Sequence, residues 1–228
     1  LEGTIDAKID PFENNENINE AKIISFESIK LKNIDYKYPK SENNVLKGIN
    51  LEVHKGESIG IIGPSGSGKT SLVDLMLGLL EPKSGEITLN DKPFMEFQKD
   101  WKKMIAYIPQ ESLMINDSLS SNIQLDDINT SNYAIDKLER SLSQAKLIEV
   151  VESLPNGVST NIGESGIRLS GGQRQRVALA RSIFHARDIL IFDEATSALD
   201  LDTEAEVVNE IRKMKGLKTM IIIAHRID

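Results

Sequence analysis

The chain has 228 residues, enough for one large domain or two small ones with a sizeable core. Its 27 lysines and arginines stand against 35 acidic residues, and a net charge of −8 argues against nucleic acid as the main partner. Because cysteine is absent, disulfides and thiolate metal sites are excluded. No apolar stretch approaches the roughly 18 residues that span a bilayer, and no signal pattern opens the chain. We expect the chain itself to be soluble.

Residues 1–22 are rich in Asn and Glu and poor in apolar side chains. We interpret them as a linker from a preceding membrane domain or as the edge of a fragment, since the chain does not begin with Met. Residues 23–228 are expected to form the folded domain. Within it, Ile29–Ile34 and Val45–Val53 alternate apolar and polar residues, which predicts strands, and we expect them to be antiparallel.

A glycine-rich turn follows the apolar strand Ser58–Ile62 and precedes an apparent helix at Ser71–Leu80. It fits the P-loop pattern G-x-x-x-x-G-K-[ST] without a mismatch. Glycines allow a backbone to approach phosphates closely, and the helix N-terminus favours negative charge. Lys69 would reach the β- and γ-phosphates, and Thr70 would place its hydroxyl on magnesium. The turn consists of Gly63, Pro64, Ser65, Gly66, Ser67, Gly68, Lys69 and Thr70. A structural turn without phosphate is the weaker alternative.

Other segments leave two interpretations open when each is taken alone. Tyr36 or Tyr38, in a predicted loop, could stack on a base, although an exposed tyrosine more often covers a sheet edge. Gln110 ends a short apolar strand and could bridge a water at a metal, or cap a loop. Ser170 is a good helix N-cap, and the glycines after it could bind an anion or form a plain cap. Residues 122–153 have helical periodicity, which predicts a helical insertion.

The strand Ile189–Glu194 is of the buried type and ends in two carboxylates. Ligands bind at this edge of parallel sheets, so Asp193 would hold magnesium and Glu194 would orient or deprotonate the attacking water. A loop ending in Asp200 then leads to a predicted helix, Thr203–Lys215. The last predicted strand brings His225 to the same edge, where it could hydrogen-bond the γ-phosphate or be structural.

From about Ile29 to its last residue, the chain resembles the nucleotide-binding domain of ABC transporters. The resemblance rests on the motifs above in this order, including the signature Leu169–Gln173 and the loop Ser197–Asp200. It implies an α/β fold: a P-loop NTPase core with a mainly parallel sheet, an N-terminal antiparallel β subdomain and an inserted α-helical subdomain at 111–168. In relatives the domain continues past the histidine with at least one more strand and helix, so we expect the C-terminal edge to be truncated.

The resemblance also implies roles for individual residues, with ATP and Mg²⁺ as cofactors. Tyr38 resembles the aromatic that stacks on adenine, with Tyr36 as the second choice. The implied nucleotide-binding positions are Tyr38, Gly63, Pro64, Ser65, Gly66, Ser67, Gly68, Lys69, Thr70, Ser71, Ser170, Gly171, Gly172, Gln173 and Asp200. The implied magnesium positions are Thr70, Gln110 and Asp193, and the implied catalytic ones are Glu194, His225, Gln110 and Lys69.

Family members act in pairs, and the resemblance therefore implies partners. Residues Ser170 to Gln173 are expected to close over ATP bound to a second copy, giving a head-to-tail homodimer with two catalytic sites. A switch that binds nucleotide without turnover is disfavoured because Glu194 is present. The other expected partner is the transmembrane domain of a transporter, which would place the chain at the cytoplasmic face of the inner membrane. No nucleic-acid partner is expected.

Two loops, Leu154–Gly157 and Thr160–Gly166, resemble the exporter pattern, in which a glutamate loop touches the coupling helices of the membrane domain. Within exporters, Ser71–Ile87 and Lys218–Arg226 look most like bacterial flippases of lipid-linked oligosaccharides. The resemblance thus implies an ATP-hydrolysing domain that powers export or flipping. The alternatives are a soluble ABC ATPase of DNA repair or translation, which the charge balance disfavours, and an importer subunit, which normally lacks this glutamate loop.

Overall fold

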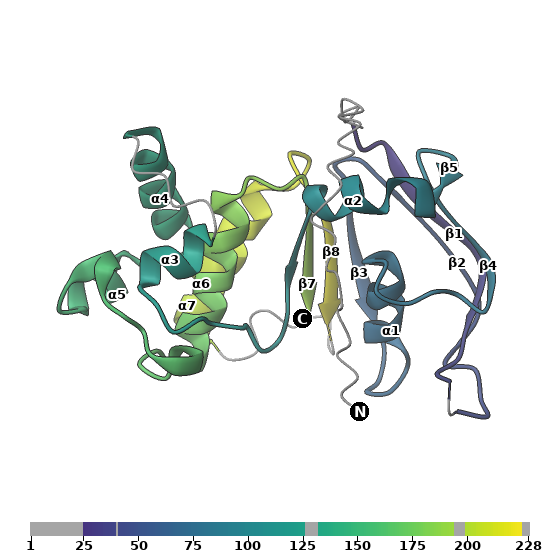
Figure 1. Ribbon diagram of the computed structural model, residues 1–228, viewed down its shortest axis with the longest axis horizontal. Helices are drawn as coiled ribbons and strands as arrows, with labels where there is room; N and C mark the ends of the chain where they lie inside the picture. The colour runs from purple at the N-terminus through teal and green to yellow at the C-terminus, as the bar shows by residue number, and fades with distance from the viewer. Residues whose placement is uncertain (1–24, 40, 126–131, 194–198, 225–228) are drawn as a thin grey trace, which may run out of the picture.

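The computed structural model describes residues 25–39, 41–125, 132–193 and 199–224 (Figure 1). Its strands are β1 Ser28–Tyr36, β2 Leu46–His54, β3 Ser58–Ile62, β4 Ser84–Leu89, β5 Lys92–Pro93, β6 Ile105–Ile108, β7 Ile189–Asp193 and β8 Thr219–Ala224. Its α-helices are α1 Lys69–Met76, α2 Gln98–Met104, α3 Leu119–Gln124, α4 Asn132–Gln144, α5 Ile148–Ser153, α6 Gly171–Phe184 and α7 Leu201–Lys213. Short 3₁₀ turns are η1 Phe94–Phe97, η2 Gly157–Ser159 and η3 Glu164–Gly166.

The described strands form two separate sheets of different kinds. The first is antiparallel, in the order β2-β1-β4-β5, and the second is parallel, in the order β3-β8-β7-β6. The expected antiparallel pairing of the early strands is therefore present. All five residues of β7 are buried, which explains why the four before Asp193 form an unbroken apolar run.

Helix α1 lies between the two sheets (Figure 1). Its buried side chains share one core with β1, β2 and β4 on one side and with alternate residues of β7 and β8 on the other. In β7, Ile189 and Ile191 face this core, whereas Leu190 and Phe192 belong to the core beneath α6. Successive side chains of a strand point to opposite faces. Asp193 therefore lies on the α1 side of the sheet.

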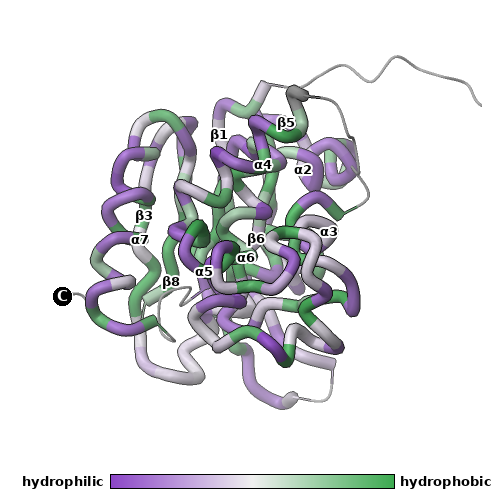
Figure 2. Tube along the Cα trace, turned by 90° about the vertical axis from the view of Figure 1, so that its left-hand side faces the viewer, coloured by the Kyte–Doolittle hydropathy of each residue, from purple (hydrophilic) through white to green (hydrophobic). Residues whose placement is uncertain are grey.

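The opposite face of the parallel sheet is covered by α6 and α7, with α3, α4 and α5 beyond them (Figure 1). Along α7 the hydrophilic and hydrophobic segments alternate from turn to turn, as expected for a helix with one buried face (Figure 2). The predicted helical insertion corresponds to α3–α5 and the short turns after them. Within the described ranges, no helix combines the length and the apolar character needed to cross a bilayer.

The predicted helix Ser71–Leu80 differs from the observed one. Helix α1 begins two residues earlier, at Lys69, and ends at Met76, because Gly78 adopts a positive φ of 69°. The N–H of Leu79 then donates to the carbonyl of Asp74 at 2.8 Å, which closes the helix. Leu79, inside the predicted range, is consequently not helical and is 63% exposed.

Helix α2 was not predicted from the sequence, which offers only one aromatic residue there. That residue, Trp101, is fully buried between the rings of Phe26 and Phe94, and its indole N–H donates to the carbonyl of Met76 at 2.7 Å. The hydrogen bond joins α2 to the end of α1. Tertiary packing rather than periodicity therefore fixes this short helix.

Replacing Trp101 with Phe is expected to lower the free energy of unfolding by about 1–3 kcal/mol. The substitution leaves the buried Met76 carbonyl without its indole donor and removes part of a packed ring. Urea unfolding of the variant measures this loss. As a control, Leu217→Ala removes a side chain that is 80% exposed and should stay within about 0.5 kcal/mol of the unchanged chain. Equal stability of the two variants would contradict the role given to Trp101.

Candidate functional site

The glycine-rich turn connects β3 to α1, at the carboxyl edge of the parallel sheet. Gly66 and Gly68 have φ values of +78° and +93°, which favour glycine. A Cβ on Gly68 would lie 2.8 Å from Cδ2 of Leu46, and one on Gly63 would lie 2.7 Å from Oγ of Ser67. The turn is thus packed closely against β2 and against itself, while a Cβ on Gly66 would meet nothing within 4 Å.

The side chain of Lys69 is buried although it carries an ammonium group. It folds back over the turn and donates to the carbonyls of Gly63 at 2.8 Å and of Pro64 at 3.1 Å. Thr70, the next residue, is exposed, and Ser71 is buried. The turn therefore brings together the ammonium group of Lys69, the exposed hydroxyl of Thr70 and the first N–H groups of α1. An anionic phosphate chain requires this set of donors.

The two candidate tyrosines have different surroundings. Tyr36 is buried, whereas Tyr38 is 42% exposed and packs edge-on against Tyr36, with ring centroids 5.0 Å apart. The hydroxyl of Tyr38 lies 3.0 Å from Oγ of Ser71, so the ring is tied to the first turn of α1. Of the two, only Tyr38 offers a ring face beside the P-loop to a base.

Asp193 ends β7 and is buried. Its Oδ2 accepts a hydrogen bond of 2.9 Å from the hydroxyl of Tyr107, on the neighbouring strand β6. Burial, together with this bond to a carboxylate, raises the pKa of Tyr107 above its ordinary value, so the phenol stays protonated and donates. Burial and the charge of Asp193 also raise the pKa of Asp74, on α1. Tyr107 and Asp74 were not identified from the sequence.

The other positions predicted at this edge are only partly described. Gln110 is exposed, just after β6, and its carbonyl accepts a hydrogen bond of 3.2 Å from Nε2 of Gln175 on α6. That bond links the chain around Gln110 to the helix of the signature. Glu194 and His225, predicted as catalytic, lie outside the described residues, as do Ser197 and Ala198 of the loop before α7.

The signature forms the N-terminus of α6. Oγ of Ser170 accepts from the N–H of Gln173 at 3.2 Å, and the side chain of Gln173 accepts from the N–H of Ser170 at 2.8 Å. This reciprocal capping box confirms the predicted N-cap. Helices α1 and α6 cover opposite faces of the parallel sheet (Figure 1). The helix of the signature and the helix of the P-loop are thus separated by the sheet within one chain.

Asp200 lies at the N-terminus of α7, where its carboxylate accepts from the N–H of Thr203 at 3.0 Å. This hydrogen bond lowers the pKa of Asp200 and keeps the side chain ionised. In the structure the visible role of Asp200 is therefore to cap α7. A contact with nucleotide, as the resemblance implies, stays a prediction.

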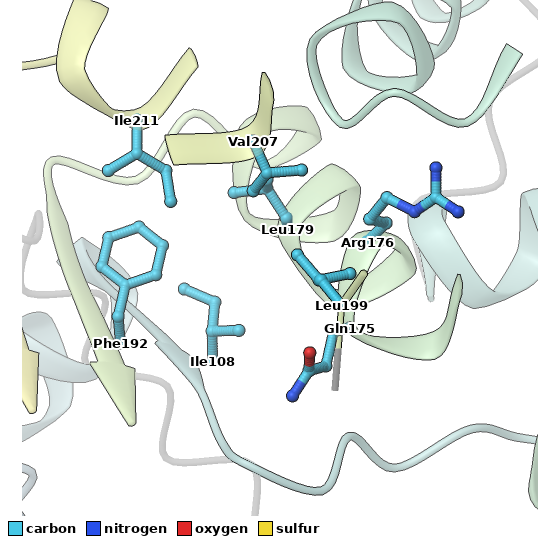
Figure 3. Close-up of a pocket in the computed structure, with 8 residues that line it drawn as sticks. All are labelled: Ile108, Gln175, Arg176, Leu179, Phe192, Leu199, Val207 and Ile211. Atoms are coloured by element: carbon cyan, nitrogen blue, oxygen red, sulfur yellow. The ribbon is translucent and has the colours of Figure 1, made fainter. Parts of the chain in front are cut away.

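A small cavity on the α6 face of the parallel sheet is separate from this site (Figure 3). It lies between β6, β7, α6 and α7 and is lined mainly by apolar side chains, while the guanidinium of Arg176 points away from it. With a volume of about 10 Å³ it has room for no more than a single water. It therefore offers no alternative nucleotide pocket.

The parallel sheet, with a P-loop after β3 and a carboxylate at the end of β7, defines the class of P-loop NTPases. Comparison with known families specifies the class further, because the family described as "ABC transporter" matches residues 46–197. The chain belongs to the ABC transporter family. The predicted family and the predicted fold class are thereby confirmed.

Individual relatives agree with this assignment. The ATP-dependent lipid A-core flippase of Ralstonia nicotianae is 37% identical over 227 residues, which cover 99% of this chain and 38% of that protein. A putative export ATP-binding/permease protein of Rickettsia prowazekii is 38% identical over 204 residues, 88% of this chain and 35% of that protein. A solved bacterial Atm1-family ABC exporter with ATP bound shares 32% identity and a TM-score of 0.81, over 89% of this chain and 35% of that one. The chain thus spans less than two fifths of the length of these relatives.

Proposed function

We propose that this chain is the ATPase domain of an ABC exporter, binding and hydrolysing ATP with magnesium. One observation carries the proposal: the P-loop after β3 and Asp193 at the end of β7 lie at the same edge of one parallel sheet, with α1 starting at Lys69. This is the edge at which open α/β sheets bind ligands. The names of the relatives, which are ATP-dependent flippases and exporters, support the same function.

The side chains at this edge fit a magnesium ion. Thr70 supplies a hydroxyl, Asp193 a buried carboxylate and Gln110 an amide oxygen, and magnesium prefers oxygen ligands. Magnesium would neutralise charge that develops on the phosphates. In this proposal Thr70 and Asp193 hold the ion, Asp193 through water. Gln110 senses the ion, and the hydrogen bond to its carbonyl connects it to helix α6.

The remaining proposed roles concern the nucleotide and the attacking water. Lys69, which now bonds the carbonyls of Gly63 and Pro64, would turn to the β- and γ-phosphates. Tyr38 would stack on adenine. Glu194 would accept a proton from the attacking water, and His225 would donate a hydrogen bond to the γ-phosphate.

We propose a head-to-tail dimer because the signature and the P-loop begin helices on opposite faces of one sheet. In the dimer, residues 170–173 of one copy would close over ATP on the partner copy. The ATP-driven closing would act on a membrane domain, and this part of the proposal rests on the much longer exporter relatives. The cytoplasmic face of the membrane is the corresponding location. A lipid-linked oligosaccharide as cargo stays a prediction, since the flippase relative named above is a lipid A-core flippase.

The test measures phosphate release by the purified protein with ATP and magnesium, next to nucleotide binding by titration. The proposal predicts both binding and release, and removal of magnesium with EDTA is expected to stop release. Binding without release would favour the alternative of a nucleotide-dependent switch, and the absence of binding would reject both functions.

A further inference from the structure

Tyr107 stands out because its polar end is directed at the buried carboxylate of the site. It lies on β6, which pairs in parallel with β7 so that Tyr107 is opposite Ile191. Its ring packs on the α1 side of the sheet, and its hydroxyl reaches Oδ2 of Asp193 at 2.9 Å. If packing were the only role of residue 107, a phenylalanine would fill the same space. The hydroxyl of Tyr107 therefore needs a separate explanation.

The surroundings of Asp193 explain why a neutral donor would be useful there. Asp74, on the adjoining helix α1, is near enough for the charge of Asp193 to act on it. Without a donor, the two carboxylates would repel each other in a half-buried setting, and the Asp193 side chain could turn away. A phenolic O–H that donates to a carboxylate forms a charge-assisted hydrogen bond without bringing a competing positive charge.

A carboxylate has two oxygens, and this bond occupies one of them. With Oδ2 held by Tyr107, rotation of the Asp193 side chain is restricted and the direction of Oδ1 is fixed. A carboxylate that is held within a few tenths of an ångström accepts better from the waters of magnesium, since this ion keeps its ligands in near-ideal octahedral geometry. The hydroxyl thus acts on the ion through Asp193.

We propose that Tyr107 is a positioning residue of the magnesium site, holding one oxygen of Asp193 so that the other is presented to a water of the ion. The inference rests on the proposed function, and it adds a residue that the motifs do not contain. Tyr107 itself touches neither nucleotide nor metal.

The variant Tyr107→Phe removes the hydroxyl and keeps the ring. The experiment titrates magnesium into the complete protein with a fixed amount of ATP and follows nucleotide affinity. We expect the magnesium concentration that gives half of the full ATP affinity to rise about tenfold. A change of this size corresponds to the loss of one hydrogen bond to a charged group. Affinity for ATP in EDTA is expected to stay unchanged, since the phosphate contacts of the P-loop are untouched. A merely structural effect would lower both affinities together and would overturn the proposal.

Two further variants establish whether Tyr107 acts through Asp193. In an Asp193→Asn background, Tyr107→Phe should produce no additional shift in the magnesium titration, because the group that it positions is altered. An equal shift in both backgrounds would overturn the proposal. Ser141→Ala is the control: it removes a buried hydroxyl that donates to the carbonyl of Leu138, in α4, and should leave the magnesium titration unchanged.

If Tyr107→Phe does not fold, 3-fluorotyrosine at position 107 keeps the hydroxyl and reports on it by ¹⁹F NMR. The resonance should move when magnesium is added to the ATP complex and stay in place when ATP is added in EDTA. A ¹⁹F chemical shift that does not change when magnesium is added would refute the proposal. Should the unchanged protein bind no ATP at all, the proposed function fails, which is a different outcome from normal binding with an unaltered magnesium titration in the variant.

Discussion

Replacing Glu194 with Gln is expected to slow ATP hydrolysis by about 10²–10⁴-fold, the usual contribution of a general base. Glu194 directly follows Asp193 in the sequence, and Asp193 ends β7 at the sheet edge where the P-loop lies. The amide keeps the size and polarity of the side chain but cannot take a proton from water. ATP binding should therefore remain, and the dimer with unhydrolysed ATP should accumulate. Phosphate release and nucleotide titration measure the two effects separately.

The control for this variant is Glu152→Gln, which makes the same chemical change on the exposed side of α5. Its hydrolysis rate should equal that of the unchanged chain. Full turnover by Glu194→Gln would remove Glu194 from the role of base, and the water would then need another proton acceptor.

Replacing Lys69 with Ala is expected to weaken ATP binding by about 10–100-fold, because hydrogen bonds to charged groups contribute roughly 1.5–3 kcal/mol each. The ammonium group already lies within the turn, 2.8 Å from the carbonyl of Gly63, so it needs only a small movement to meet a phosphate. Calorimetric titration with ATP measures the affinity.

Loss of Lys69 also removes two hydrogen bonds within the turn, so a thermal melt without ATP must accompany the titration. A variant that is folded but binds weakly supports the phosphate role. Lys215→Ala, which removes an exposed lysine near the end of α7, is the control and should bind ATP normally. An unaltered ATP affinity in Lys69→Ala would disprove the assignment.

Most of the core was predictable because its signals are local. The P-loop needs glycines at fixed positions, β7 has four apolar residues in a row, and Ser170 with Gln173 forms a cap that can be read directly from the sequence. Helix α2 could not be predicted, since its stability comes from Trp101 filling a space between distant rings. The early end of α1 was missed for a similar reason: Gly78 is tolerated in a helix, and only its positive φ shows that the helix stops.

The site was predictable where a motif defines it and unpredictable where strand neighbours define it. Asp193 follows from its position after a buried strand, but its hydrogen bond with Tyr107 depends on the pairing of β6 with β7, across 86 positions of sequence. Asp74 likewise becomes a neighbour only when α1 packs on the sheet. The resemblance had already put Tyr38 before Tyr36, and the burial of Tyr36 supports that order.

The central claim is that two copies enclose two nucleotides, each copy closing the site of the other. Native mass spectrometry of the Glu194→Gln protein with magnesium and ATP tests it directly. The account predicts a complex of two chains with two ATP molecules, and Ser170→Arg in the same background should reduce it to single chains that each retain one ATP. If the Glu194→Gln protein shows only single chains with ATP, the proposed dimer is wrong. It is also wrong if paired chains persist after Ser170→Arg is added.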